Sequence, residues 1–288
     1  MVDIDGYLRR LRLSDPGPPS AANLARLHRA HVEHVPYSTV DIQLGRPGSL
    51  DPEEAAARIV RTGRAGYCYQ LNGAFALLLG TLGYDVRHHR GCVTDDRVPA
   101  VEPFPNHLAL TVHGLPTPDH PGGSWLVDAG LGDAMRDPVA LRSGAVRQGD
   151  FAYGLRASEA FAGGWRFEHD PRGSFGAMDF ESDDALPSAI AAGHRYLSTA
   201  PESVFVQRLT IQRRDATGID KLVSRSLLHI DATGTEVREL ASRAGLFEAV
   251  RAVFGLTLDD LDDCDRDRLW QRAQAGHEQW LRERSGTG

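Results

Sequence analysis

RAGYCYQLN, residues 64–72, places a cysteine, Cys68, directly after a turn and at the expected start of a helix. Apolar residues follow at helical spacing as far as Leu82, and Gly83 is typical of a helix end. The thiol would lie at the positive end of the helix dipole, with Arg64 near in sequence, and both features favour the thiolate. A buried cysteine that only fills space is the alternative, and this segment alone leaves both interpretations open.

The chain before this segment is predicted to be helical. Ser20 precedes an apolar face that includes Leu24. Asp51 is a capping residue, and Pro52 suits the first position of the helix that follows. Together with the helix that begins near Cys68, these signals indicate a helical first third.

After Gly83 the apolar pattern changes from helical to strand-like. Short runs rich in β-forming residues alternate with proline and glycine clusters, which predicts a small barrel or sandwich up to about residue 200. Three further strands and two helices are expected beyond it, with turns at the two Asp-Ala-Thr-Gly segments, 215–218 and 231–234. The strands are expected at 84–93, 107–113, 125–128, 203–213, 222–230 and 236–240, and the late helices at 246–254 and 265–282.

The composition is that of an acidic globular protein. With 288 residues, of which 41% are hydrophobic and 25% charged, the chain has room for two or three packed units and is too apolar for a disordered protein. A net charge of −7 argues against a nucleic-acid partner, because such proteins need a basic surface. Lys221 is the only lysine among 32 basic residues, a bias that we attribute mainly to genome composition.

Three cysteines, Cys68, Cys92 and Cys264, are odd in number and too widely spaced for a disulfide framework or a four-ligand zinc site. The N-terminus lacks the residue order of a signal peptide, and the longest apolar stretch, residues 74–84, is too short to span a membrane. We therefore expect a cytoplasmic protein with no membrane partner, in which Cys92 and Cys264 have structural roles.

A thiolate used for acyl transfer needs a base, and the base needs a carboxylate that orients it. His107 opens one predicted strand, and Asp128 ends another just before a glycine loop. Strand ends hold side chains rigidly, so both residues are candidates for these roles. Taken singly, each is more often a structural residue than a catalytic one.

The cysteine segment resembles the Arg-Gly-Gly-x-Cys-x-(Glu/Gln)-x-Asn signature of the arylamine N-acetyltransferases. His107, and then Asp128 followed by Ala-Gly-Leu-Gly, fall where that family places the rest of its Cys-His-Asp triad. Segments 27–47 and 254–256 also look like the family's N-terminal and C-terminal regions. The resemblance therefore covers nearly the whole chain.

The resemblance implies an α+β fold of three closely packed units. These are an N-terminal helical bundle at residues 1–85 that carries the nucleophile, a central β-barrel at 86–200 that carries the other two triad residues, and a C-terminal α/β lid at 201–288. The order Cys, His, Asp is similar to that of cysteine proteinases, although the Cys-to-His separation is too short for a papain-like enzyme.

The chemistry implied by the resemblance is acetyl transfer from acetyl-CoA to an arylamine, a hydrazine or an N-hydroxyarylamine. Cys68 would attack the thioester, His107 would take the thiol proton, and Asp128 would orient the imidazole in a ping-pong route. Gly130 and Gly132 resemble the family's glycine loop near the pantetheine and the acyl group. Acetyl-CoA is thus the expected cosubstrate and a small-molecule amine the expected acceptor, with no metal.

Several positions depart from the family pattern. Tyr-Ser-Thr follows Pro36 where most members have Phe-Glu-Asn, and the missing glutamate removes the usual carboxylate partner of Arg64. Tyr37 and Leu131 stand in place of phenylalanines, and we expect both to shape the acceptor pocket. A small residue, Ala65, replaces the first glycine of the signature.

Two alternatives to an acetyltransferase stay open. Relatives with this fold act as amide synthases, which take an acyl chain from a carrier-protein thioester and release it, often as a macrolactam. The changed residues at positions 37 and 131 favour this alternative, in which an acyl carrier protein is a partner. A non-catalytic scaffold is disfavoured, because all three triad positions are present.

Two patterns mimic metal sites. His28, His31 and His34 are three residues apart on a predicted helix, but this spacing drifts around the helix and no carboxylate or cysteine completes a ligand set. Residues 263–267, DCDRD, resemble the start of a calcium loop without the glycine and glutamate that such a loop needs further on. We interpret both patterns as structural.

Overall fold

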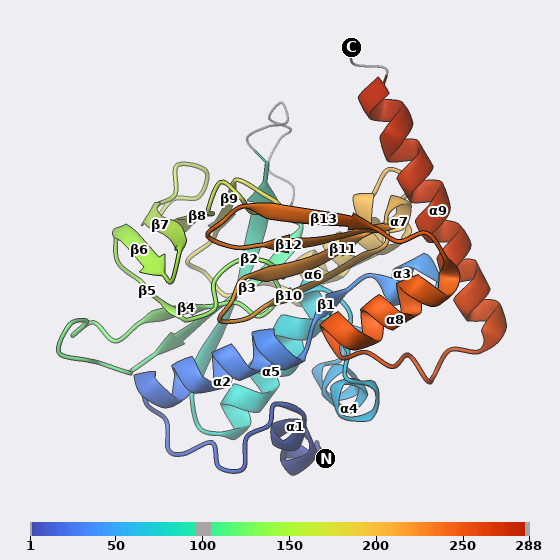
Figure 1. The fold of residues 1–288 in the computed structure, drawn as a ribbon. Helices are drawn as coiled ribbons and strands as arrows, with labels where there is room; N and C mark the ends of the chain where they lie inside the picture. The colour runs from blue at the N-terminus through green and yellow to red at the C-terminus, as the bar shows by residue number, and fades with distance from the viewer. Residues whose placement is uncertain (1, 96–104, 286–288) are drawn as a thin grey trace.

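The computed structural model of the protein describes residues 2–95 and 105–285, and within these ranges it combines helices with two sheets (Figure 1). The N-terminal part is helical, as predicted. Its helices begin at the capping residues seen in the sequence: Ser20 Oγ accepts a hydrogen bond from Asn23 N (3.2 Å), and Asp51 Oδ1 accepts one from Glu53 N (2.9 Å). The helices are α1 (Ile4–Arg10), α2 (Ala21–His34), α3 (Val40–Gln43), α4 (Pro52–Thr62) and α5 (Cys68–Thr81).

Helix α5 is the centre of this part. It is apolar on almost every side, and Leu71, Phe75 and Leu78 are completely buried against α2, α4 and the neighbouring strands. A helix buried all round is held by its neighbours and tolerates little movement. The N-terminal end of α5, with Cys68, is therefore a fixed point in the structure.

An antiparallel sheet of eight strands curls into a nearly closed barrel beside α2 and α5 (Figure 1). The sheet has the order β5-β4-β3-β2-β9-β8-β7-β6. Its strands are β2 (Asp85–Thr94), β3 (His107–His113), β4 (Trp125–Val127), β5 (Val139–Ala140), β6 (Gly144–Gln148), β7 (Phe151–Ala157), β8 (Trp165–Glu168) and β9 (Ala177–Phe180). One part of the predicted barrel region is instead helical, because Pro187 starts α6 (Pro187–Thr199).

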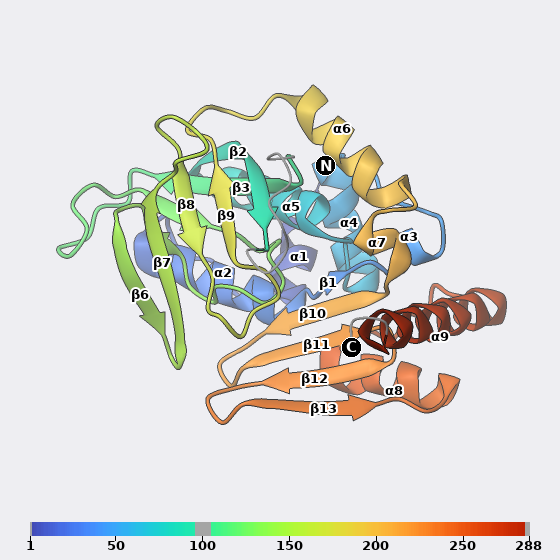
Figure 2. The ribbon, with the colours of Figure 1, turned by 90° about the horizontal axis from the view of Figure 1, so that it is seen from above.

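A second antiparallel sheet follows, with the order β1-β10-β11-β12-β13. Its first strand comes from the N-terminal part of the chain, since β1 (Tyr37–Ser38) pairs with β10. Figure 2 shows β10 against the body of the molecule and β13 furthest from it. The other strands are β10 (Thr210–Arg214), β11 (Ile219–Val223), β12 (Ser226–Ile230) and β13 (Thr235–Glu239).

Two predictions for this sheet are wrong in detail. The strand expected at 203–213 begins instead with a short helix, α7 (Val204–Gln207), because Ser203 Oγ caps it by accepting a hydrogen bond from Phe205 N. The strand expected at 222–230 is two strands, since Ser224 adopts a positive φ of 54° and Val223 pairs back with Ser226. The turns predicted at 215–218 and 231–234 are confirmed, and both join hairpin strands.

Helices α8 (Arg243–Phe254) and α9 (Asp263–Ser285) pack on the second sheet, with Ile211 and Leu222 of the sheet buried against Leu246 and Val250 of α8. Gly255 ends α8 in the left-handed conformation, as predicted. Among the described residues, no helix has both the length and the apolar character needed to cross a membrane.

Candidate active site

Cys68 lies at the first position of α5, and only 3% of its surface is exposed. Its Sγ is 3.8 Å from the carbonyl oxygen of Asn106, the residue before β3. The sequence predicts this placement at a helix N-terminus, where the dipole favours a negative charge on sulfur.

His107 and Asp128 come from adjacent strands of the barrel. His107 opens β3 and Asp128 follows β4 directly, so that His107 Nε2 lies 2.7 Å from Asp128 Oδ2, with both side chains buried. The other ring nitrogen, Nδ1, is left for the hydrogen bond between His107 and Cys68. Burial alone would lower the pKa of His107, but the charges of Asp128 and Cys68 and the hydrogen bonds to both outweigh it and raise that pKa to about 10.

Asn72 connects this pair to the helix that carries Cys68. Its Nδ2 donates to Asp128 Oδ1 (2.7 Å), and its Oδ1 accepts a hydrogen bond from Ala129 N (2.9 Å). Asn72 stands four residues after Cys68, so both side chains lie on one face of α5. Asn72 belongs to the cysteine motif, but its role was not predicted from the sequence; its spacing of four residues from Cys68 was the available signal.

His28 holds the backbone of Asp128 from the other side. Its Nε2 accepts a hydrogen bond from Asp128 N (3.1 Å), and its Nδ1 donates to the carbonyl oxygen of Arg136 (2.9 Å). Burial lowers the pKa of His28, which keeps it in the neutral form that these two bonds require. His31 instead hydrogen-bonds Tyr7. Within the part of the chain that the structure describes, no three His, Cys, Asp or Glu side chains are grouped to hold a metal.

The cysteine and the histidine open onto a cavity of about 570 Å³. This volume is typical of small-molecule sites. The cavity is lined by three of the predicted site residues, Tyr37, Gly130 and Leu131. Gly132 does not line it but contacts the side chain of Gln212, which does. The remaining lining residues are Val93, Thr94, Asp95, Asn106, Ser174, Phe175, Leu197, Val204, Phe205, Arg208, Thr210, Lys221 and Val223.

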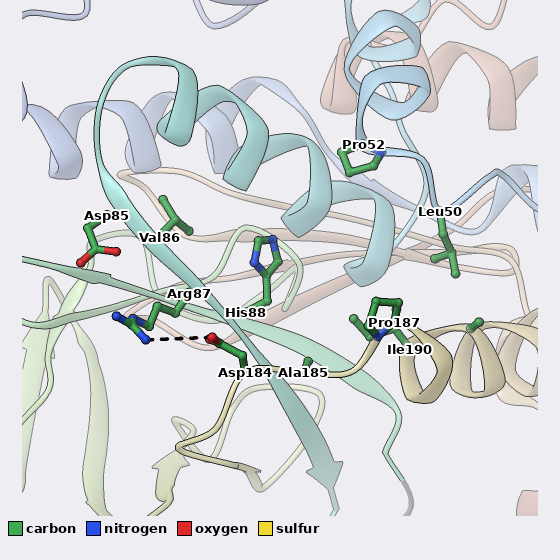
Figure 3. A pocket seen from close by; sticks show the side chains of 11 residues that line it. Leu50, Pro52, Asp85, Val86, Arg87, His88, Asp184, Ala185, Pro187 and Ile190 are labelled. Carbon is green, nitrogen blue, oxygen red and sulfur yellow. Dashed lines mark ion pairs between the residues drawn. The ribbon is translucent and has the colours of Figure 1, made fainter.

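A larger, more open cavity of about 880 Å³ lies elsewhere, between β2 and the start of α6. Figure 3 shows its lining, in which Arg87 and Asp184 form an ion pair at 4.0 Å. None of the three triad residues lines it. The cavity beside Cys68 is therefore the one in which we place the chemistry.

Gly130 brings the loop after β4 into close contact with Cys68. A Cβ atom at this position would lie 2.7 Å from the Cα of Cys68 and 2.9 Å from Asn72 Nδ2. Contacts this short do not occur in real structures, so only glycine allows the loop to lie against the start of α5. In the same loop, Gly130 N donates a hydrogen bond to Asp128 Oδ1 (2.9 Å).

Arg64 has carboxylate partners, contrary to the expectation from the missing glutamate. Its guanidinium group is fully buried and forms a bidentate pair with Asp260, at 2.8 and 2.7 Å. Asp41 adds a third contact at 3.3 Å. A buried guanidinium needs such partners, since an unpaired charge inside the protein is costly. The sequence could not show this, because Asp260 is 196 residues away.

Asp260→Asn should reveal the contribution of this ion pair through the pH dependence of protein stability. The hydrogen bonds from Arg64 hold the pKa of Asp260 below its usual range. A carboxyl group with a lowered folded-state pKa stabilises the protein above its unfolded value, about 3.9, and this contribution disappears as the pH falls through the folded-state pKa. We expect the wild type to have the higher urea midpoint at pH 7, and the gap between the two midpoints to narrow below about pH 4 and to close below the folded-state pKa. Tryptophan fluorescence in urea measures both.

The neighbouring exposed Asp259 provides the control for this measurement. Asp259→Asn makes the same chemical change without touching Arg64, so its midpoint should follow that of the wild type at every pH. A gap between wild type and Asp260→Asn that stays constant from pH 7 to pH 3 would contradict the role given to the pair.

The chain matches the family model described as N-acetyltransferase over residues 20–263. It is 31% identical to the arylamine N-acetyltransferase of Mycolicibacterium smegmatis, covering 90% of this chain and 94% of that protein. The solved structure of Mycobacterium marinum arylamine N-acetyltransferase in complex with CoA shares 28% identity and a TM-score of 0.83, over 94% of this chain and 98% of that one. Proansamycin X synthase of Amycolatopsis mediterranei is 31% identical over 49% of this chain and 53% of that protein. The chain therefore belongs to the arylamine N-acetyltransferase family of enzymes.

Proposed function

We propose that the protein transfers an acetyl group from acetyl-CoA to a small arylamine through an acyl-cysteine on Cys68. The observation that carries this proposal is the hydrogen-bonded line from Cys68 through His107 to Asp128 at the wall of one cavity. The M. marinum structure contains CoA, which supports a CoA thioester as the donor. Because the reaction needs Cys68 as a free thiol, the proposal also favours a reducing compartment such as the cytoplasm.

The first half-reaction forms the acyl-cysteine. The protonated ring of His107 stabilises the thiolate of Cys68, which attacks the carbonyl carbon of the acetyl thioester. The bond between that carbon and the sulfur of coenzyme A breaks, and the leaving thiolate takes the proton from His107 Nδ1. The N-terminus of α5 stabilises the negative charge that develops beside it.

The second half-reaction releases the amide. The amine nitrogen attacks the acyl-cysteine carbonyl, and the now neutral His107 takes a proton from that nitrogen. The carbon–sulfur bond breaks and returns Cys68 as a thiolate beside an imidazolium. Asp128 keeps the ring oriented with Nδ1 toward the cavity in both halves, since it accepts from Nε2.

The lining of the cavity supports an aromatic acceptor. Tyr37, Phe175 and Phe205 contribute rings, and Leu131 adds an aliphatic surface. Apolar and aromatic walls bind an aryl ring by burial and edge contacts, and they keep water from the acyl-cysteine.

The acyl-enzyme can be tested directly. After incubation with acetyl-CoA, digestion and mass spectrometry should find an acetyl group on the peptide that contains Cys68, and addition of 4-methoxyaniline should remove it. Thiol release during the full reaction should depend on the amine. An unmodified Cys68, in protein whose exposed Cys264 still reacts with iodoacetamide, would contradict the proposal.

Amide synthesis from a carrier-bound acyl chain is the second candidate function. The similarity to proansamycin X synthase over about half of the chain favours it. The same triad chemistry applies, with an acyl carrier protein in place of coenzyme A. Turnover with a carrier-bound thioester and none with acetyl-CoA would select this function over the first.

Gly130→Ala should slow the proposed reaction without unfolding the protein. The added methyl group pushes against the backbone of Cys68 and against Asn72, so the sulfur moves relative to His107. Displacements of about 1 Å can cost about 100-fold in rate, and we expect kcat/KM to fall by about 10- to 100-fold. Steady-state kinetics with acetyl-CoA and 4-methoxyaniline measure the effect.

Gly80→Ala is the matched control for this change. Gly80 lies in α5, the helix that Gly130 contacts, and nothing is within 4 Å of the Cβ that the substitution adds. This variant should keep wild-type kinetics and gain slightly in stability, because alanine is the better helix former. Equal kinetics for Gly130→Ala and Gly80→Ala would show that the contact with Cys68 has no catalytic consequence.

A further inference from the structure

The only lysine of the chain, Lys221, lines the cavity that contains Cys68. It lies in β11, and 17% of its side chain is exposed. Its direct cross-strand partner in β10 is Gln212, so the two side chains stand next to each other on one face of the sheet.

The second sheet has two different faces. Positions 210 and 212 of β10 and positions 221 and 223 of β11 alternate along their strands and all line the cavity. Ile211 and Leu222, on the opposite face, pack in the core with α8. The cavity-facing side thus brings a hydroxyl, an amide and an ammonium group to one wall of the cavity, with Tyr37 of β1 paired beside Gln212. Such polar groups in an otherwise apolar cavity fix the orientation of a ligand.

Asp133 attracts the ammonium group of Lys221 by charge and leaves the N–H donors of that group free of a hydrogen bond to it. The carboxylate of Asp133 is completely buried and accepts hydrogen bonds from Ser174 N and Ser174 Oγ, both at 2.9 Å. His169 Nε2 is 3.4 Å away, and Lys221 Nζ is 3.9 Å from Oδ2. At 3.9 Å the lysine is attracted by charge but is beyond hydrogen-bond distance. Burial would raise the pKa of Asp133, but the hydrogen bond from His169 and the charge of Lys221 lower it to about 2, so this anchor stays charged.

An ammonium group has three donors. Within residues 2–95 and 105–285, Lys221 has this ion pair and no hydrogen bond to protein. Among the described residues, the charged groups that line the cavity are the Cys68 thiolate, Asp95, protonated His107, Arg208 and Lys221, so three cations stand against two anions. A negatively charged ligand group would supply the acceptor that Lys221 lacks.

We propose that Lys221 is a specificity-determining residue that binds a carboxylate on the substrate. This inference rests on the proposed acyl transfer and names the class of molecule that the cavity prefers. The carboxylate has two sources, an acidic group on the aromatic amine or a distal carboxylate on the acyl group of the donor. In both cases Lys221 donates from Nζ to the carboxylate, and Gln212 next to it can donate from Nε2.

The acceptor arm of the test compares 4-aminobenzoate with its neutral isostere 4-aminobenzamide, using acetyl-CoA as donor. A hydrogen bond to a charged group is worth enough for about a 10- to 100-fold preference in kcat/KM, and we expect the wild type to prefer the acid by that factor. Lys221→Met should remove the preference, and Lys221→Arg should restore part of it because it keeps the charge.

The donor arm compares malonyl-CoA with its neutral isostere acetoacetyl-CoA, using 4-methoxyaniline as acceptor. A preference for malonyl-CoA that Lys221→Met abolishes assigns the carboxylate to the acyl group, and a preference confined to 4-aminobenzoate assigns it to the amine. Arg238→Met is the control in both arms, since it removes one cation from the exposed strand β13 of the same sheet. Its preference ratios should equal those of the wild type.

Several results would overturn the inference. The first is equal kcat/KM for acid and neutral substrate in both arms with the wild type, which needs no variant to fold. The second is a Lys221→Met variant with a lower melting temperature and unchanged ratios, which would make Lys221 only a counterion for Asp133. Turnover of neutral amines without any preference leaves the proposed acyl transfer intact, whereas absence of acetyl-Cys68 removes the proposed function itself.

Discussion

Cys68→Ala is expected to abolish acyl transfer while leaving the fold unchanged. The proposed mechanism has no other group that can accept the acetyl, since the other described nucleophilic thiols, Cys92 and Cys264, do not line the cavity. Loss of a catalytic nucleophile costs about 10⁴-fold or more in kcat. The change removes one sulfur atom from a side chain at a helix start, so the melting temperature should move little. Amide formation from acetyl-CoA and 4-methoxyaniline is the measurement.

Cys264→Ala is the companion variant, because it removes a thiol that is exposed and does not line the cavity. It should keep wild-type turnover and the acetyl label on Cys68. Turnover by Cys68→Ala within 10-fold of the wild type, a factor well inside the loss expected for a nucleophile, would mean that the acyl group does not pass through this residue.

Asp128→Asn should be the second most damaging change, and the hydrogen bonds around the carboxylate explain why. Oδ1 accepts from Asn72 Nδ2 and from Gly130 N, whereas Oδ2 accepts from His107 Nε2. An asparagine has only one acceptor oxygen, and two donors compete for it on the Asn72 side. The amide nitrogen would therefore face His107 and demand an unprotonated Nε2.

This tautomer carries its proton on Nδ1, where the proposed mechanism needs a base. We expect kcat to fall by about 10³- to 10⁴-fold with little change in KM for the amine. The reaction of Cys68 with iodoacetamide at neutral pH should slow in parallel, because the ring no longer holds the positive charge that stabilises the thiolate. Asp137→Asn, which changes a carboxylate outside the cavity, should affect neither measurement. Near-normal turnover by Asp128→Asn would make the triad assignment wrong.

Local signals predicted most of the elements and failed where distant contacts decide. As the sequence indicates, helices begin after Ser20 and Asp51 and one helix ends at Gly255. These ends are predictable because capping depends on a few neighbouring residues. Helix α7 was missed because Val, Phe and Val favour strands, and only the cap at Ser203 indicates the helix. The division of 222–230 was missed because a serine rather than a glycine takes the positive φ.

The candidate site shows the same division. The cysteine at a helix start and the two residues at strand ends could be found from the sequence, since each lies at the boundary of a predictable element. His28 and Asp128, whose backbone it contacts, are 100 residues apart, so no local sequence pattern predicts this contact. Lys221 was attributed to composition, because only the pairing of β11 with β10 shows that its side chain faces the cavity.

The ion pair between Arg64 and Asp260 has a consequence for folding during synthesis on the ribosome. Arg64 stands four residues before Cys68, and its partner Asp260 is made 196 residues later. At about 5–20 residues per second, translation takes about 10 to 40 s to reach that partner. Until then we expect the guanidinium group of Arg64 to stay in water. Burying it with Asp41 alone would leave the N–H groups that pair with Asp260 without an acceptor. We therefore expect the segment around Cys68 to close over Arg64 only after the C-terminal part of the chain has been made.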